Sequence, residues 1–307
     1  MIWVIFPAWN EERVIRPTLL ELWKAYKDRN EPYTAVLVND GSTDRTVEEA
    51  QAAVAESGGQ MKLVVLTHEV NRGLGAGLRT GIYWVLDQAA DDDVLVTLDA
   101  DNTHPPRLIP ELVKRVRAGA DLSIASRYRS GAEVHGVPGY RRALSDVASI
   151  LFSTLYPIPG VKDYTCCFRA YRIPLLRRAR AVYGEQLCTA KGFEAVMDLL
   201  LRLGPLGMKV DEMGFVLDYG DRVGQSKMKV VKTIQSTLKL LIKRRWERIT
   251  IWTPKHIAEL EAADRRTPVV TPGVPGGCPG VGWCSGELSY VMRMDSRVPA
   301  GSAMGDS

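Results

Sequence analysis

Short β-rich runs alternate with longer amphipathic stretches through the first 126 residues, and this alternation constrains the fold more than any other feature. The apolar runs are typical of buried strands, and the stretches between them are typical of helices. The predicted strands are Ile2–Phe6, Thr34–Asn39, Lys62–Thr67, Asp93–Leu98 and Asp121–Ser126; the predicted helices are Glu12–Lys27, Arg45–Glu56, Gly75–Gln88 and Arg107–Arg117. We therefore expect an α/β fold, with a parallel or mixed sheet covered by helices on both faces.

Composition narrows the class of protein. The chain has 307 residues, of which 46% are hydrophobic and 25% charged, as in a globular protein with room for one large α/β domain and additions. A net charge of +4 is too small to indicate a nucleic-acid partner. The five cysteines form no Cys-x-x-Cys pair and no zinc-like spacing, which is typical of reduced thiols in a cytosolic protein. We expect a cytoplasmic protein that binds no nucleic acid.

The apolar segments predict no element that crosses a membrane. Residues 1–7 lack a basic region and are too short an apolar run for a signal peptide. No run approaches about 18 uninterrupted apolar residues, and the nearest, residues 143–161, is broken by Asp146, Pro157 and Pro159. The chain is expected to be soluble or to lie on a membrane surface.

The regular alternation ends after residue 126. Arg127–Tyr140 is polar and Gly-rich and is predicted to be a loop, whereas Arg141–Tyr156 returns to helical periodicity. Lys209–Leu217 is predicted to be a late strand. We take residues 1–228 as one domain. Residues 263–307 are rich in Pro and Gly and lack periodicity, so we expect a disordered tail with no catalytic part.

Residues 229–262 are predicted to form a basic amphipathic helical segment. Between residues 222 and 255 there are ten Lys or Arg residues and one acid, Glu247. Apolar residues recur there at three- and four-residue spacing: Val231, Ile234, Leu238, Leu241, Ile242 and Ile249. Another face carries Lys229, Lys232, Lys239 and Lys243. Such a helix can lie on an anionic bilayer, or it can pack its apolar stripe onto the domain and leave its lysines in water.

Polar motifs follow four of the predicted strands. They are Pro7-Ala-Trp-Asn-Glu-Glu12, Asn39-Asp-Gly-Ser-Thr-Asp44, Asp99-Ala-Asp101 and Ser126-Arg-Tyr128. Because the carboxyl ends of parallel strands share one edge, carboxylates and an arginine are expected to converge on one cleft. Two carboxylates one residue apart suit a Mg²⁺ or Mn²⁺ ion that bridges to a phosphate. Each motif could also be only a turn or a helix cap, as at Asp44, but four at one edge favour a binding site.

These motifs, with Gly73-Leu-Gly-Ala76 and Gly81 between them, resemble in order those of the family 2 glycosyltransferases, which have the GT-A fold. Two later motifs, Asp163-x-Thr-x-x-Phe-Arg-Ala-Tyr171 and Arg222-x-Gly-x-Ser-Lys-Met228, resemble the dolichol-phosphate and polyprenol-phosphate mannosyltransferase branch. The resemblance covers about residues 2–230. It implies that residues 1–228 form a GT-A catalytic domain, a nucleotide-diphospho-sugar transferase fold with a Rossmann-like mixed sheet. Cys166-Cys167 stands where the family usually has Ser-Gly, and we expect both to be small packing residues.

The resemblance also implies roles for single residues. The nucleotide sugar would be bound by Pro7, Trp9, Glu11, Val38, Asp40, Asp99, Ala100 and Asp101. Asp101 would hold Mg²⁺ or Mn²⁺ on the diphosphate, with Asp99 and Thr103 as further ligands. The diphosphate and the acceptor phosphate would be bound by Arg127, Arg141, Arg222 and Lys227, since a guanidinium group matches phosphate well. The expected catalytic residues are Asp99, Asp101, Arg127 and Arg222.

The implied activity is metal-dependent, inverting transfer of a hexose from a nucleotide sugar to a polyprenyl phosphate. GDP-mannose is the favoured donor, and the protein would be peripheral at the cytoplasmic face of a membrane. The alternative is a family 2 enzyme that uses UDP-glucose or another acceptor. A dinucleotide-dependent oxidoreductase is more remote: Gly73-x-Gly75-x-Gly77 resembles a phosphate-binding loop, but Leu78 stands where that fingerprint requires glycine.

Overall fold

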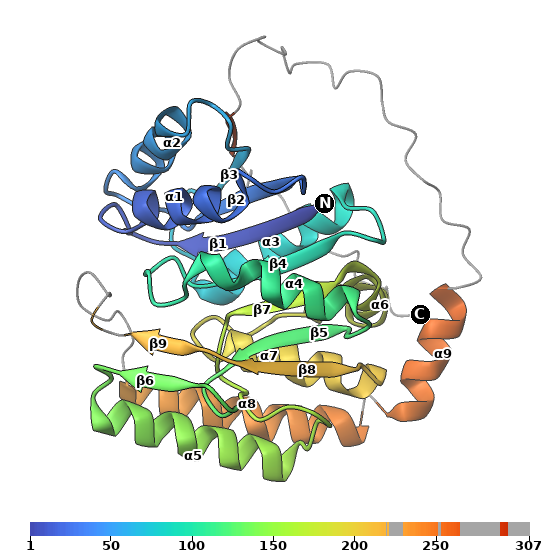
Figure 1. Cartoon of the computed structure of the whole chain (residues 1–307). Coiled ribbons are helices and arrows are strands. Elements are labelled where there is room, and N and C mark those ends of the chain that lie inside the picture. Colours follow the sequence, from blue (N-terminus) through green and yellow to red (C-terminus); the bar gives the residue numbers. More distant parts are fainter. Residues whose placement is uncertain (219, 221–229, 251–252, 265–288, 294–307) are drawn as a thin grey trace.

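The computed structural model describes residues 1–218, 220, 230–250, 253–264 and 289–293 (Figure 1). These residues form a central mixed sheet of eight strands in the order β10-β3-β2-β1-β4-β7-β5-β8. The strands are β1 (Ile2–Ala8), β2 (Tyr33–Asn39), β3 (Leu63–Thr67), β4 (Val94–Thr97), β5 (Leu122–Ser126), β7 (Arg169–Arg172), β8 (Val210–Gly214) and β10 (Ser289–Arg293). A separate two-stranded sheet pairs β6 (Glu133–His135) with β9 (Val216–Asp218).

Helices cover both faces of the central sheet. One face carries α1 (Ile15–Tyr26), α2 (Thr46–Glu56) and α4 (Ile109–Arg117); the opposite face carries α3 (Leu74–Gln88), α6 (Ile173–Tyr183) and α7 (Ala195–Leu203) (Figure 1). Short 3₁₀ turns occupy Pro106–Leu108, Gly184–Gln186 and Gly204–Leu206. Because helices shield both faces, the residues of β2 and β4 are buried along their whole length. The expected α/β architecture is confirmed.

The register of β1 and β2 brings two of the motifs together. Ile2 lies opposite Tyr33 and Ala8 lies opposite Asn39, so the two parallel strands end side by side. The Asp40 N–H continues the ladder by donating to the Ala8 carbonyl at 2.8 Å. The residues that follow both strands therefore leave the sheet at one point of its carboxyl edge.

Strand β7 was not predicted, and it changes the layout of that edge. It lies between β4 and β5 and runs antiparallel to both. Neighbouring strands are about 4.8 Å apart, so the end of β5 lies two strand spacings from the end of β4. We expected the motifs after β4 and β5 to converge because the carboxyl ends of parallel strands share one edge, but β7 lies between these two strands.

Two predicted boundaries are also corrected. The segment 127–140, expected to be a loop, contains the short strand β6. The predicted late strand is divided into β8, which joins the central sheet beside β5, and β9, which leaves it to pair with β6. Gly214 ends β8 where an added Cβ would lie 2.3 Å from the Ser130 carbonyl oxygen, so the chain passes too closely there for a side chain.

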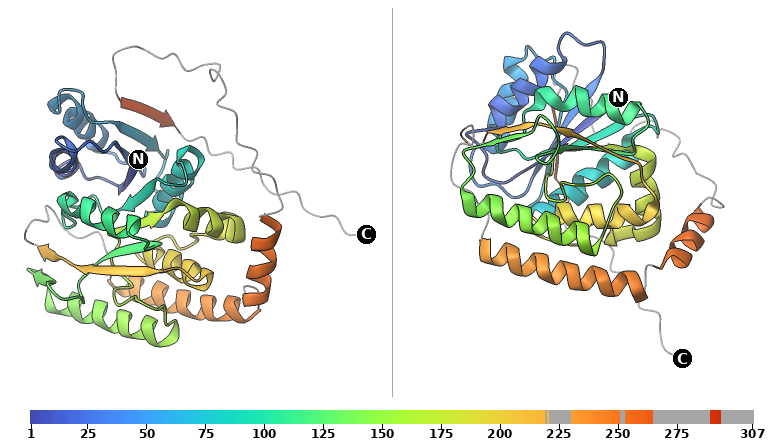
Figure 2. Two further views of the ribbon diagram at one scale, coloured as in Figure 1. Left: turned by 45° about the vertical axis from the view of Figure 1, so that its right-hand side comes forward. Right: turned by 60° about the horizontal axis from the view of Figure 1, so that its bottom comes forward.

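Three further helices complete the molecule. Helices α5 (Gly139–Leu155) and α8 (Val230–Thr250) lie side by side along one end of the structure, and α9 (Pro254–Asp264) follows α8 (Figure 2). The Tyr156 hydroxyl, just beyond α5, donates to the Leu241 carbonyl of α8 at 2.7 Å. Helix α8 is thus joined to the α/β body.

Buried ion pairs also hold α8 in place. Arg244 binds Asp198 of α7, with Nε to Oδ1 at 2.6 Å, and also contacts Glu247. Arg202 of α7 binds Glu247 at 2.9 Å. Removing one partner from a buried pair leaves an uncompensated charge, so this network fixes the rotation of α8 about its axis.

The C-terminal tail departs in one place from the expected disorder. Ser289–Arg293 form β10, which pairs in parallel with β3 at the edge of the sheet. Parallel pairing needs only backbone groups, which explains why this strand has no clear sequence pattern. For these five residues the prediction of a disordered tail is wrong; residues 265–288 and 294–307 lie outside the described part of the chain.

Candidate active site at the carboxyl edge of the sheet

A cavity of about 1170 Å³ opens at the carboxyl ends of β1, β2 and β4. Seven residues predicted from the sequence to bind the nucleotide sugar line it: Pro7, Trp9, Glu11, Asp40, Asp99, Ala100 and Asp101. Its other walls come from the start of α3, from residues 188–194 and from α8. Three segments far apart in the sequence therefore enclose one space.

Reciprocal hydrogen bonds join the loops after β1 and β2. The Asn10 N–H donates to Ser42 Oγ at 3.0 Å, and Asn10 Oδ1 accepts from the Thr43 N–H at 2.8 Å. Asn10 has φ +56°, a left-handed conformation that asparagine tolerates better than most residues. Asp44 accepts from the Thr46 N–H at 3.0 Å in the first turn of α2. The turn interpretation of Asp44 is therefore correct, but the N-cap of α2 is Arg45, which makes no side-chain cap bond.

Asp40 organises the loop that leads into α3. Its Oδ1 accepts from the Arg72 N–H at 2.9 Å and lies 2.7 Å from His68 Nδ1, while its Oδ2 accepts from the Gly73 N–H at 2.7 Å. His68 is buried, and its Nε2 lies 2.9 Å from Thr80 Oγ1 on α3. Asp40 therefore lines the cavity and also fixes residues 68–73. His68 was missed because a single histidine in a loop gives no sequence signal.

The glycines at the start of α3 allow a close backbone approach. An added Cβ at Gly75 would lie 1.7 Å from the Ala190 carbonyl oxygen, and one at Gly73 would lie 2.4 Å from the Lys191 carbonyl oxygen. The Gly75 N–H donates to that Lys191 oxygen at 3.2 Å. These glycines bring α3 against residues 190–191 and so close one wall of the cavity, a role unlike that of a dinucleotide phosphate loop.

The Asp99-Ala100-Asp101 segment is held by the residues that follow it. Thr103 donates its hydroxyl to Asp101 Oδ1 at 2.6 Å and its N–H to the same oxygen at 3.2 Å. The Asp99 N–H donates to His104 Nδ1 at 3.1 Å, and the His104 ring stacks on Phe168. Asn102 turns the chain with φ +64°. Thr103, expected to be a metal ligand, is buried and orients Asp101.

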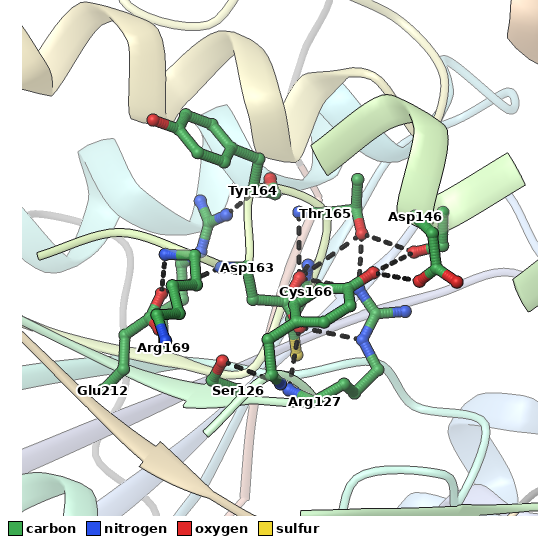
Figure 3. Close-up of polar contacts among 12 residues, drawn as sticks. Ser126, Arg127, Asp146, Asp163, Tyr164, Thr165, Cys166, Arg169 and Glu212 are labelled. Atoms are coloured by element: carbon green, nitrogen blue, oxygen red, sulfur yellow. Dashed lines mark hydrogen bonds and ion pairs between the residues drawn. The ribbon is translucent and has the colours of Figure 1, made fainter. Parts of the chain in front are cut away.

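Arg127 forms an ion pair with the buried Asp163 (Figure 3). Its Nε and Nη2 bind the two oxygens of Asp163 at 2.8 and 2.6 Å, and Nη2 also contacts Thr165. Burial would raise the pKa of Asp163, but the facing Arg127 outweighs it and holds that pKa below its ordinary value. The Asp163-x-Thr165 motif therefore binds Arg127, which is not among the described residues that line the cavity.

The remaining predicted residues are distributed as follows. Val38 is fully buried, where added Cβ atoms at Gly77 and Gly81 would touch it, and so lies beneath α3. Arg141 lies at the start of α5, with Nε 3.1 Å from the Tyr140 hydroxyl, and is also absent from the described lining. Arg222 and Lys227 lie outside the described residues. Their roles remain predictions.

Cationic side chains that the sequence did not assign line the cavity instead. They are Arg72, Arg79, Lys191, Lys239 and Lys243. The first three flank the α3 start and the 188–194 segment, and the last two lie on α8. The sequence placed Lys239 and Lys243 on a face of their own, but only the structure brings that face to the cavity.

The cysteines behave as packing residues. Cys166, Cys167 and Cys188 are buried and unpaired. Burial raises the pKa of Cys188 to about 12 and raises that of Cys167 as well. These two thiols are therefore protonated and unreactive at neutral pH, as expected for Cys167.

Comparisons with known proteins agree with the sequence resemblance. A dolichol-phosphate mannosyltransferase of Pyrococcus furiosus is 32% identical over 246 residues, which cover 80% of this chain and 64% of that protein. The chain thus spans less than two thirds of that relative. An undecaprenyl-phosphate mannosyltransferase of Micrococcus luteus is 29% identical over 79% of this chain and 95% of its own length.

A structural comparison supports the fold. The crystal structure of glucosyl-3-phosphoglycerate synthase from Mycobacterium tuberculosis in complex with Mn²⁺, UDP-glucose and phosphoglyceric acid superposes with a TM-score of 0.54 at 21% identity, covering 80% of this chain and 79% of that one. None of the described helices is sufficiently long and apolar to cross a bilayer. Residues 3–179 match the family described as glycosyl transferase family 2. The chain belongs to glycosyl transferase family 2 and has the GT-A fold.

Proposed function

We propose that the protein transfers a hexose from a nucleotide sugar to a polyprenyl phosphate, with GDP-mannose as the donor. The observation that carries the proposal is the single cavity in which Asp99 and Asp101 lie with several cationic side chains. A transferase that joins two phosphorylated substrates needs positive charge both for the leaving diphosphate and for the incoming phosphate. The two prenyl-phosphate mannosyltransferase relatives support the acceptor and the sugar.

The donor set at Asp99 and Asp101 fits a divalent cation. Mg²⁺ is usually bound by one or two carboxylates together with substrate phosphates. Within the described residues no cluster of three or more His, Cys, Asp or Glu side chains is suited to a metal, so Asp99 and Asp101 would share the ion with the donor diphosphate. Bound there, Mg²⁺ or Mn²⁺ would supply Lewis acidity to the leaving group. The Mycobacterium tuberculosis synthase was crystallised with Mn²⁺.

The transfer step follows from the chemistry of the acceptor. A phosphate monoester has a second pKa of about 6 and is largely dianionic at neutral pH, so it needs no strong general base. One of its oxygens attacks the anomeric carbon, the bond from that carbon to the diphosphate oxygen breaks, and the nucleoside diphosphate leaves with the electron pair. Direct attack inverts the anomeric centre, so an α-linked donor gives a β-linked lipid-phosphate sugar.

A polyprenyl phosphate lies in a membrane, and helices α5 and α8 have a surface suited to contact with one. Nine of the thirteen large hydrophobic side chains exposed among the described residues belong to α5 and α8, so the apolar surface is concentrated there: Tyr140, Val147, Ile150, Leu155, Val231, Ile234, Leu238, Ile242 and Trp246. We call these nine residues the apolar surface. Basic residues of α8 accompany it, as anionic lipid requires. We propose that it places the enzyme peripherally on a bilayer.

An activity matrix tests the proposal. Purified protein is assayed with GDP-mannose and UDP-glucose against a polyprenyl phosphate and against phosphoglyceric acid, with Mn²⁺ or with chelator. We expect mannosyl transfer to the lipid, lost in chelator, and a loss of about 100-fold or more in Asp101→Ala. Asp28→Asn, at an exposed position, is the control. Activity only with UDP-glucose and a soluble acceptor, which the M. tuberculosis structure makes the second candidate, would refute it.

A further inference from the structure

A buried histidine, His68, joins three elements of the α/β body. It directly follows β3 and is only 1% exposed. Its Nδ1 lies 2.7 Å from Oδ1 of Asp40, the residue after β2, and its Nε2 lies 2.9 Å from Thr80 Oγ1 on α3. The His68 N–H also donates to the Asn39 carbonyl at 2.9 Å. His68 is therefore held by its backbone and by both ring nitrogens.

The partners of the His68 ring decide which nitrogen carries the proton. A carboxylate can only accept, so Nδ1 is protonated and donates to Asp40. In the neutral ring Nε2 then has a lone pair, which accepts from the Thr80 hydroxyl. One tautomer makes both bonds, so the Thr80 hydroxyl fixes the orientation of the ring and the ring fixes the carboxylate of Asp40.

The carboxylate of Asp40 has about four acceptor positions, and protein groups fill three of them. Oδ1 accepts from the His68 ring and from the Arg72 N–H, whereas Oδ2 accepts only from the Gly73 N–H among the described residues. Asp40 lines the cavity, although it is only 4% exposed. One acceptor position on Oδ2 is therefore available to an N–H group of a bound molecule.

We propose that His68 and Thr80 are positioning residues that hold Asp40 so that its last acceptor position meets the nucleobase of the donor. The ligand class is a base with an N–H on its ring edge, which guanine and uracil have and adenine and cytosine lack. A site built around such a bond rejects a base without the N–H, because the buried acceptor is then left unpaired. Thr80 is not among the described residues that line the cavity, so its effect on the donor passes through His68. The inference rests on the proposed function, which it deepens by assigning base selectivity.

Calorimetry on the full chain with Mn²⁺ tests the selectivity, with GDP compared with ADP and UDP compared with CDP. Thr80→Val replaces the hydroxyl by a methyl group, and Thr154→Val, at an exposed position on α5, is the matched control. For wild type we expect GDP to bind about tenfold or more tightly than ADP. Thr80→Val should weaken GDP binding about fivefold and leave ADP binding unchanged. Thr80→Ser, which keeps the hydroxyl, should restore the preference for GDP, and Thr154→Val should not alter it.

Kinetics separate positioning of the base from catalysis. The nucleobase is remote from the bond that breaks, so Thr80→Val should raise the donor KM and leave kcat at saturating donor unchanged. Equal losses of GDP and ADP affinity, or a lower Tm with an unchanged preference, would show that these contacts only stabilise the fold, and either result overturns the inference.

The wild type alone separates the inference from the proposed function. A protein that prefers neither GDP to ADP nor UDP to CDP overturns the inference. A preference for UDP over CDP, lost in Thr80→Val, together with weak GDP binding would support the inference and refute GDP-mannose as the donor. A wild type that binds none of the four nucleotides would refute both the inference and the proposed function.

Discussion

Several side chains whose chemistry suits catalysis or ligand binding also stabilise the structure of this molecule. Asp40 was expected to bind the nucleotide sugar and Thr103 to bind a metal, and each is also bound to protein groups: Asp40 to the 68–73 loop and Thr103 to Asp101. Asp163, which the sequence left without a role, binds Arg127. The hydrogen bonds of Asp40 and Thr103 position the groups that face the cavity. A motif can therefore mark a site correctly and still leave the role of each member open.

The Arg127–Asp163 pair predicts a pH-dependent stability. Because the folded pKa of Asp163 is lowered, its contribution is fully present above the unfolded pKa of about 3.9 and is lost as the pH falls through the folded pKa. Asp163→Asn removes the carboxylate charge that Arg127 faces, so we expect a loss of about 3–5 kcal/mol at pH 7. Urea unfolding from pH 7 to pH 3 should show this difference narrowing below about pH 4. A difference that stays constant through that range would contradict the assignment.

At the scale of elements, the central strands could be predicted and the strand that matters most for the site could not. Strands β1 to β5 are apolar runs buried on both faces, which the sequence displays directly. Strand β7 has only four residues, two of them arginines, and Arg169 is buried because its guanidinium donates to the carbonyls of Val196 and Tyr164. Helix α7 is buried throughout, its two charged residues Asp198 and Arg202 included, so its polar face does not mark a surface that meets solvent. Such elements are specified by tertiary contacts that local patterns do not contain.

The dependence on tertiary contacts also determines which residues of the site could be predicted. The residues after β1, β2 and β4 could be brought together from the parallel-sheet rule alone, because those strands are adjacent. Arg127 could not be placed, since that required knowledge of β7. The lysines of α8 could not be placed either, because their approach to the cavity depends on the rotation that Arg244 and Asp198 impose.

The start of α3 offers a test of the close approach between elements. Gly75→Ala would force its Cβ against the Ala190 carbonyl oxygen, a backbone atom that cannot move away cheaply. We expect a loss of about 1–3 kcal/mol in stability, together with weaker donor binding because the cavity wall shifts. Gly139→Ala, in open space at the start of α5, should be near neutral. Equal urea midpoints for the two variants would show that the wall accommodates the methyl group.

For the whole molecule, the proposed membrane binding predicts that α5 and α8 face the lipid. The double variant Ile150→Ser/Ile242→Ser changes one highly exposed apolar side chain on each helix, at 66% and 73% exposure. We expect flotation with vesicles that contain anionic lipid to fall several-fold, while Tm and donor binding stay unchanged because neither side chain packs in the core. Val70→Ser, on a loop far from both helices in sequence, is the matched control. Undiminished flotation of the double variant would remove this surface from the proposal.

Asp198 joins two parts of the molecule that form different walls of the cavity. One of its carboxylate oxygens binds Arg244 of α8, and the other accepts the N–H groups of Thr189 and Ala190 at 2.9 and 3.0 Å. The buried Asp198 carboxylate thus connects α8, the helix that would rest on lipid, to the backbone of residues 189–190 in the cavity wall. If the proposed function holds, and if the nucleotide sugar and the bilayer favour different positions of α8, each would change the affinity for the other by the same factor.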